Sequence, residues 1–120
     1  LIPRQSSDAY AVDDPVIAKA LRFIADHSHE CIRVSDVARG VGISRRGLER
    51  RFELQGGRTI RQEIIHFKVE RLKRLLVQSD QTMKQLAFDV GFKDGNQMYL
   101  VFNRVVGMSP SRYRKQQQAL

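Results

Sequence analysis

The 120-residue sequence is poor in the features that mark secreted and membrane proteins. It has one cysteine, Cys31, which excludes an internal disulfide framework and is typical of a reducing cytoplasm. No apolar run approaches the roughly 18 residues of a membrane span, and no signal-like segment opens the chain. We therefore predict a cytoplasmic protein with no membrane partner. Because the sequence opens at Leu1 without a methionine, we expect it to be a piece of a longer chain.

Residue sets that would support catalysis or a cofactor are also missing. The sequence shows no paired carboxylates, no Ser/His/Asp arrangement and no glycine loop of the kind that binds phosphates. His27, His29 and Cys31 alternate in "HSHEC", but helical metal ligands favour i, i+4 spacing and no second cluster completes four ligands. The sequence therefore predicts a protein that is not an enzyme and that has no cofactor and no metal.

Acidic residues are scarce relative to basic ones. Lysine and arginine number 21 against 13 aspartates and glutamates, which gives a formal net charge of +8. Residues 1–14 hold one arginine and three aspartates, a net charge of −2, so residues 15–120 carry +10. This balance favours a polyanionic partner, which could be DNA, RNA or an anionic membrane surface. The remaining interpretation is a basic, soluble protein without such a partner.

Stretches that alternate between polar and apolar residues are too short to indicate a sheet. Helical spacing occurs throughout, and 42% apolar residues suffice for a core, so the sequence predicts one all-α domain. About seven helices are expected, of which the fourth, ending near residue 79, is the longest. The residues expected to cap or open them are Asp14, Ser35, Ser44, Thr59, Thr82, Asp94 and Ser109.

The helical pattern contains an internal repeat. The segments "VARGVGISRRGLERRF" (37–52) and "LAFDVGFKDGNQMYLVF" (86–102) share an alanine, a Val-Gly pair, a polar turn and two apolar residues four apart. The glycine suits a tight turn and the alanine lets helices pack closely, so each copy predicts a helix-turn-helix. The expected organisation is a linker or the tail of a preceding sensor domain over 1–13, helix-turn-helix subdomains over 14–57 and 81–116, a linker helix over 58–80, and a tail over 117–120.

The second helix of each repeat is expected to enter the DNA major groove by its N-terminal end. With Ser44 as its cap, the first such helix turns its large apolar residues inward and presents Arg46, Glu49 and Arg50 on the opposite face. Arginine hydrogen-bonds guanine O6 and N7, and a carboxylate accepts from cytosine N4, so these three are predicted to read bases. The residues expected to meet phosphates are Ser44, Arg45 and Arg51.

The same face has a simpler interpretation, in which the charges are solvated and Glu49 pairs with Arg45 or Arg46 along the helix. Within a tandem repeat we favour base reading, because an acid in a phosphate-lined groove is repelled unless it bonds a base or orients an arginine. Gly47 lies near this surface at a cost of about 1 kcal/mol relative to alanine. We hypothesise that its missing side chain gives clearance to bases or phosphates.

The second repeat presents a less charged face and is expected to be the weaker reader. Its predicted base-reading residues are Gly95, Asn96, Gln97 and Leu100. Asparagine and glutamine suit adenine, whereas leucine can touch only a thymine methyl group. Between the repeats, about 20 helical residues at ~1.5 Å each span about 30 Å, close to the ~34–36 Å of one DNA turn. The sequence therefore predicts a two-part reader of double-stranded DNA.

The C-terminal segment "LAFDVGF…MYLVFNRVVGMSPSRYR" (86–114) resembles the signature of AraC/XylS-type transcription regulators. The residues that match it are Gly91, Phe92, Phe102, Arg104, Gly107, Ser109, Pro110, Tyr113 and Arg114. "GISRRGLERRF" and "ERLKRLL" are similar to that family as well, so the resemblance covers about residues 15–116. It implies seven helices in two helix-turn-helix subdomains that bind promoter DNA, and it assigns base reading to the same seven positions.

The sequence departs from the family pattern at a few places. Met98 replaces a usual phenylalanine, and Lys68 and Leu72 replace a usual arginine and alanine in the linker helix. Leu100 stands where a polar or basic residue often reads DNA, which puts its own contact with bases in question.

The opening "IPRQSSDAYAVDDP" (2–15) resembles the exit of a periplasmic-binding-protein-like sugar sensor, as in the xylose-operon regulator branch of the same family. This resemblance implies a full-length protein that senses a pentose such as xylose through an N-terminal domain. It also implies dimerisation through that domain and RNA polymerase as a further partner.

Other classes of function fit the basic composition. A nucleoid-type protein would bind nucleic acid without sequence preference, with an affinity set by salt alone. A protein-interaction module would dock its basic face on an acidic partner, and the basic linker helix could meet a membrane surface if its apolar residues were not needed for the core. The tandem repeat, with an acid in its reading face, favours sequence-specific promoter binding.

Overall fold

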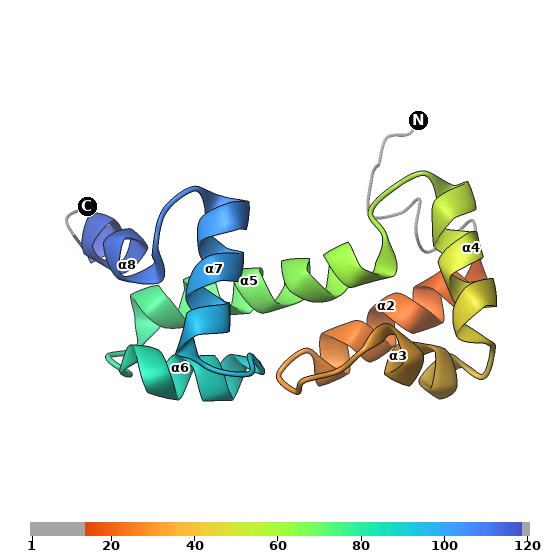
Figure 1. Cartoon of the computed structure of the whole chain (residues 1–120), viewed down its shortest axis with the longest axis horizontal. Helices are drawn as coiled ribbons and strands as arrows, with labels where there is room; N and C mark the ends of the chain where they lie inside the picture. The colour runs from red at the N-terminus through yellow and green to blue at the C-terminus, as the bar shows by residue number, and fades with distance from the viewer. Residues whose placement is uncertain (1–13, 119–120) are drawn as a thin grey trace. The chain divides into compact units, whose positions relative to one another are not determined.

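The computed structural model describes residues 14–118, so the predicted linker over 1–13 lies outside the described residues. Over this range the chain forms seven α-helices and no strand, which confirms the all-α class. The helices are α2 (Pro15–His27), α3 (Val34–Val41), α4 (Arg45–Gln55), α5 (Ile60–Gln78), α6 (Met83–Val90), α7 (Gly95–Val106) and α8 (Pro110–Gln118) (Figure 1). They belong to two compact units, which comprise residues 14–27 with 32–64 and residues 28–31 with 65–118.

Most helices begin at the caps that the sequence predicts. The Oδ1 atom of Asp14 accepts a hydrogen bond from Val16 N at 2.9 Å, and Pro15 opens α2 where an N–H is not needed. The Oγ atom of Ser44 accepts from Gly47 N at 3.0 Å at the start of α4. Reciprocal capping boxes form at the two predicted pairs, Thr59 with Gln62 and Thr82 with Gln85.

The start of α3 differs from the prediction. Ser35, the expected cap, lies inside the helix, which begins at Val34 after Arg33. Arg33 has an extended backbone, and its N–H donates to Asp36 Oδ2 at 2.8 Å. An acid at the third helical position therefore satisfies this backbone group without a hydroxyl at the cap. The rule that places Ser or Thr at the cap misses this arrangement.

The first unit packs α2 against α3 and α4. Leu48 and Phe52 are buried, as the sequence predicts, and this orients α4 with its charged face outward. In α2 the buried positions include Ala20, whereas its neighbour Leu21 is half-buried. The buried apolar residues of this unit are Ile17, Ala20, Ile24, Val34, Val37, Ala38, Leu48, Phe52, Ile60 and Ile64.

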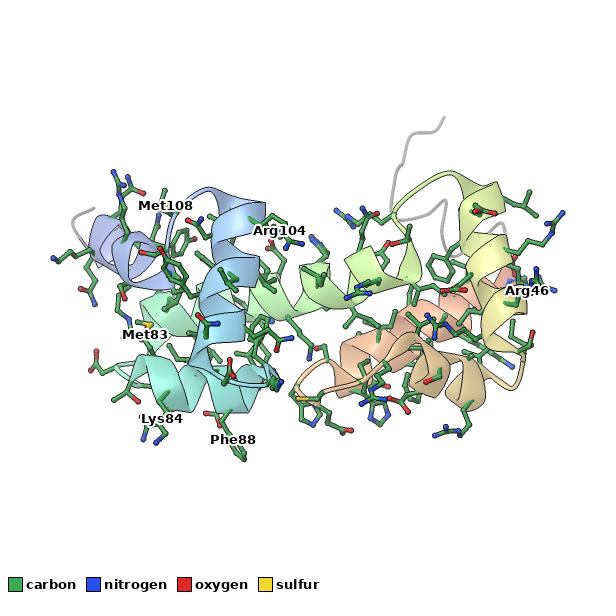
Figure 2. The ribbon with its side chains drawn as sticks, viewed as in Figure 1. Arg46, Met83, Lys84, Phe88, Arg104 and Met108 are labelled. Atoms are coloured by element: carbon green, nitrogen blue, oxygen red, sulfur yellow. The ribbon has the colours of Figure 1, made fainter. Side chains whose placement is uncertain are left out.

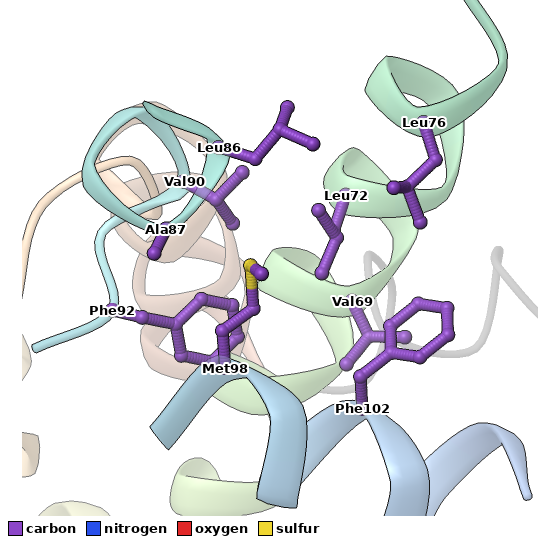
Figure 3. Packing of buried hydrophobic residues seen from close by; sticks show 9 residues of the cluster. All are labelled: Val69, Leu72, Leu76, Leu86, Ala87, Val90, Phe92, Met98 and Phe102. Atoms are coloured by element: carbon purple, nitrogen blue, oxygen red, sulfur yellow. The ribbon is translucent and has the colours of Figure 1, made fainter. Parts of the chain in front are cut away.

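The second unit has its own core between α5, α6 and α7 (Figure 3). Met98 is buried there and fills the place of the usual phenylalanine, and Phe102 stacks edge-to-face on Tyr113 of α8 with ring centroids 5.6 Å apart. The nine buried residues of this core are Val69, Leu72, Leu76, Leu86, Ala87, Val90, Phe92, Met98 and Phe102.

The end of α5 is closed by an arginine from α8. The guanidinium of Arg114 donates to the carbonyls of Leu76 at 3.0 Å, Ser79 at 3.0 Å and Gln81 at 2.8 Å. The last carbonyls of a helix have no partner within the helix, so Arg114 supplies the donors that they need. Arg114 thereby fixes the chain between α5 and α6.

Candidate nucleic-acid interface

The turn between α3 and α4 has the geometry of a helix-turn-helix. Gly42 ends α3 in the left-handed region, with φ of 90°, and donates to Ala38 O at 2.9 Å. The next residue, Ile43, donates to the same carbonyl at 3.1 Å. The chain then extends through Ser44 and enters α4. Glycine takes this positive φ without the steric cost that a Cβ atom brings.

The turn between α6 and α7 repeats that geometry. Gly91 has φ of 92°, and Phe92 N donates to Ala87 O at 2.9 Å. The chain then reaches Asp94, whose side chain accepts from Gln97 N at 2.8 Å and caps α7. The predicted tandem helix-turn-helix is therefore present, with α4 and α7 as the second helix of each copy.

The exposed face of α4 carries four arginines, of which two form ion pairs with carboxylates of the described residues and two do not. Arg45 Nε lies 3.4 Å from Glu49 Oε2, and Arg51 pairs with Asp14 at 3.1 Å. Within residues 14–118, no carboxylate lies within ion-pair distance of Arg46 or Arg50. Figure 2 shows Arg46 projecting away from α4. Arg46 and Arg50 are therefore the two arginines of this face that an external anion can reach without first displacing a carboxylate of the described residues.

The pair of Arg45 with Glu49 bears on both interpretations of Glu49. It shows that the acid does pair along the helix, as the simpler interpretation expects. Both side chains are exposed, however, and such an i, i+4 pair contributes only about 0.3–0.5 kcal/mol. A phosphate can therefore replace Glu49 as the partner of Arg45, and a base amino group can replace Arg45 as the partner of Glu49, at little cost.

The corresponding surface of α7 is nearly uncharged. Asn96, Gln97 and Leu100 are exposed, and Gly95 is half-buried. Gln97 Oε1 accepts from Lys93 N at 2.6 Å, so this side chain stabilises the start of the helix as well as contributing to its surface. The predicted phosphate-contacting residues Ser44, Arg45 and Arg51 are exposed too, on α4 and its cap.

Lys68 has a role that sequence analysis missed. It is one of the lysines of the basic linker helix, yet only 5% of the residue is exposed. Its Nζ donates to Ser28 O at 2.6 Å, Glu30 O at 2.5 Å and Val90 O at 3.3 Å. Burial lowers the pKa of Lys68 to about 8, although nearby Cys31 and Glu30 act in the opposite direction. Lys68 therefore holds residues 28–30 against the end of α6.

The region of the "HSHEC" motif has contacts of its own. Cys31 Sγ donates to Gly91 O at 3.2 Å, and His29 Nε2 lies 3.4 Å from Glu30 Oε2. Among the described residues, no group of three or more histidines, cysteines, aspartates or glutamates is arranged to hold a metal ion. None of the helices in this range has both the length and the apolar character needed to cross a membrane.

Comparison with known proteins identifies the family. A family model described as a helix-turn-helix domain matches residues 37–116, two-thirds of the chain. The fold also matches a transcriptional regulator with an AraC-type DNA-binding domain from Chromobacterium violaceum, at a TM-score of 0.79 and 25% identity over 89% of this chain and 96% of that one. This chain belongs to the AraC-type helix-turn-helix family.

Two further relatives of this AraC-type domain bear on its role. The DNA-binding domain of the global transcriptional factor AdpA, solved in complex with a target DNA, is 32% identical, with a TM-score of 0.80, and the match covers 89% of this chain and 96% of that one. The xylose operon regulatory protein of Escherichia coli K12 is 32% identical over 114 residues, which are 95% of this chain and 29% of that protein. The chain thus spans under a third of the length of this regulator.

The family settles the class of the AraC-type domain. It is a DNA-binding domain of transcription regulators and not an enzyme, as the sequence predicts. The AdpA domain, a structural relative, is solved with its target DNA, which supports the predicted DNA partner.

Proposed function

We propose that this AraC-type domain binds promoter DNA with sequence specificity and that α4 and α7 each read a segment of the major groove. The observation that carries the proposal is the exposed pair of arginines, Arg46 and Arg50, on the outer face of α4 without carboxylate partners among the described residues. They would read guanine, while Glu49 would accept from a cytosine amino group. The composition of the α7 surface supports adenine contacts by Asn96 and Gln97.

The remaining assignments follow from position. Gly95 allows the backbone of α7 to approach the groove, and Leu100 would contact a thymine methyl group. Ser44, Arg45 and Arg51 lie beside the reading face of α4 and would contact phosphates, which position the domain without reading sequence.

We further propose that the full-length protein is a cytoplasmic, sugar-responsive regulator. Two observations support this: the 32% identity to the xylose operon regulatory protein, and the small share of that protein that the chain spans. An N-terminal domain would then bind a pentose such as xylose and pair two copies of the protein. RNA polymerase would be the partner through which transcription responds.

The test of the proposed function is the selection of preferred duplexes from a random DNA pool at physiological salt, where phosphate attraction does not mask specificity. We expect a motif of two clusters centred about 10 base pairs apart, with guanine and cytosine under the α4 cluster. A pool that shows no enrichment would instead support a nucleoid-type protein that binds every sequence alike.

Arginine substitutions test the assignment of single residues. Arg46→Ala or Arg50→Ala is expected to cost about 1–3 kcal/mol of binding free energy on the selected duplex and to relax the preference at one base pair. Arg22→Ala, which removes an exposed arginine from α2, serves as the control with the same change in charge. Competition binding against duplexes altered at single positions measures both effects. An equal loss on every sequence would contradict base reading.

A further inference from the structure

The carboxylate of Asp14 serves two helices of the first unit at once. Its Oδ1 atom caps α2 by accepting from Val16 N at 2.9 Å. The same carboxylate accepts from Nη1 of Arg51 in α4, at 3.3 Å to Oδ1 and 3.1 Å to Oδ2. Figure 1 shows the start of α2 beside α4. The first residue of the described chain therefore holds a side chain of the helix that is proposed to read DNA.

This ion pair is only partly open to solvent. The side chain of Asp14 is 19% exposed and that of Arg51 is 47% exposed. Burial raises the pKa of the Asp14 carboxyl, but hydrogen bonds from Val16 and Arg51 and the charge of Arg51 outweigh it and hold the pKa below its ordinary value. Asp14 is therefore ionised at neutral pH, and it neutralises Arg51 in the free domain.

Beside the ion pair there is room for another group to contact Arg51. A shallow hollow beside the ion pair is lined by Asp14, Gly47, Arg50, Arg51, Leu54 and Gln55. An anion in this hollow meets Arg50 and Arg51 together. A DNA phosphate is such an anion, and arginine binds its oxygens with the same fork geometry that it uses for a carboxylate.

We propose that Asp14 competes with a DNA phosphate for Arg51 and thereby lowers the affinity of this domain for DNA. The inference rests on the proposed function, which assigns Arg51 to the phosphate backbone. In the free domain Arg51 binds Asp14, and on DNA it exchanges the carboxylate for a phosphate oxygen. When Arg51 neutralises the phosphate, the DNA releases one condensed cation, but the freed carboxylate of Asp14 attracts a cation in turn. The exchange of partners by Arg51 therefore contributes almost nothing to the net number of ions released on binding.

The test is a double-mutant cycle on the selected duplex, with affinity measured across a range of salt concentrations. Asparagine caps a helix as well as aspartate does, so Asp14→Asn keeps the cap of α2 while it removes the competing charge. We expect Asp14→Asn to bind about two- to fivefold more tightly, the range of an exposed ion pair. The slope of log affinity against log salt should steepen by about 0.9, the value for one added phosphate contact.

Arg51→Gln separates the proposed competition from general electrostatics. In the wild type this substitution should change the salt slope little, whereas in the Asp14→Asn background it should reverse both the tighter binding and the steeper slope. Asp26→Asn, which removes an exposed acid elsewhere on α2, should leave both quantities close to those of the wild type. Circular dichroism of each variant verifies that the helices are intact.

The outcomes separate the two proposals. If Asp14→Asn binds no more tightly, or if its effect persists with Arg51→Gln, the competition is wrong, while a loss at Arg46→Ala still supports the proposed function. If no duplex is preferred and Arg46→Ala changes nothing, the proposed function itself fails, and the competition fails with it.

Discussion

Gly91→Ala is expected to destabilise the second unit strongly, whereas the equivalent substitution in the first repeat, Gly42→Ala, costs its unit much less. Both glycines have φ near +90°, so alanine meets the same backbone penalty of about 1–2 kcal/mol at each. Their surroundings differ. A Cβ atom on Gly91 would lie 2.6 Å from Lys68 Nζ and 2.7 Å from Glu30 O, whereas one on Gly42 meets nothing within 4 Å.

The difference between the two variants isolates the close approach at Gly91. Overpacking of this kind adds about 1–3 kcal/mol or more, because a backbone carbonyl cannot move aside as a flexible side chain can. We expect Gly91→Ala to lose about 3–5 kcal/mol in urea unfolding and Gly42→Ala about 1–2 kcal/mol. Hydrogen exchange should show lost protection in α6 and α7 of the Gly91 variant. Equal losses in the two variants would show that backbone strain alone determines the cost.

Lys68→Met is expected to destabilise the second unit by at least about 2 kcal/mol at neutral pH, because three carbonyls lose their donor and each buried unsatisfied group costs about 1–3 kcal/mol. The carbonyls belong to Ser28, Glu30 and Val90, so the substitution frees residues 28–30 as well as the end of α6. Methionine keeps the length and the packing of the side chain, which confines the change to the ammonium group. Lys73→Met, a half-buried lysine on the same helix, is the control.

The pH dependence of stability gives a second measurement on Lys68. The pKa of Lys68 is about 8 in the folded protein, against about 10.4 in an unfolded chain. Between these values the unfolded chain binds more protons, so the free energy of unfolding rises with pH, at no more than about 1.4 kcal/mol per unit from this group. The rise should be absent from Lys68→Met, and the difference between the two proteins removes the contribution of other groups. A difference that stays constant from pH 8 to pH 10.5 would contradict the lowered pKa.

Much of the secondary structure could be predicted from interactions between residues that are close in the sequence. Five helices begin at a predicted cap, because the side-chain oxygen of the cap accepts from a backbone N–H only two or three residues further on. The five caps are Asp14, Ser44, Thr59, Thr82 and Asp94. Local information failed at Arg33, where an acid three residues later replaced the expected hydroxyl cap. The base-reading positions were assigned from helical spacing and remain predictions until DNA is tested.

Contacts between distant residues could not be predicted in this way. Arg51 and Asp14 are 37 positions apart, and Arg114 reaches carbonyls 33 to 38 positions away. No periodicity connects such residues, because it is the packing of helices that brings them together. The burial of Lys68 is of the same kind, since its three acceptors, the carbonyls of Ser28, Glu30 and Val90, lie 22 to 40 positions away in the sequence.

The sequence by itself determined the helices, the two repeats and the outward face of α4, because periodicity, caps and glycine turns act over a few residues. Only the tertiary structure decided which charges of that face are paired and which polar groups the interior must satisfy. Asp14 neutralises Arg51, while Arg46 and Arg50 have no carboxylate partner among the described residues. The ammonium group of Lys68 donates hydrogen bonds to three backbone carbonyls. The physical reason is that ion pairing and desolvation depend on distances between side chains, and packing sets those distances.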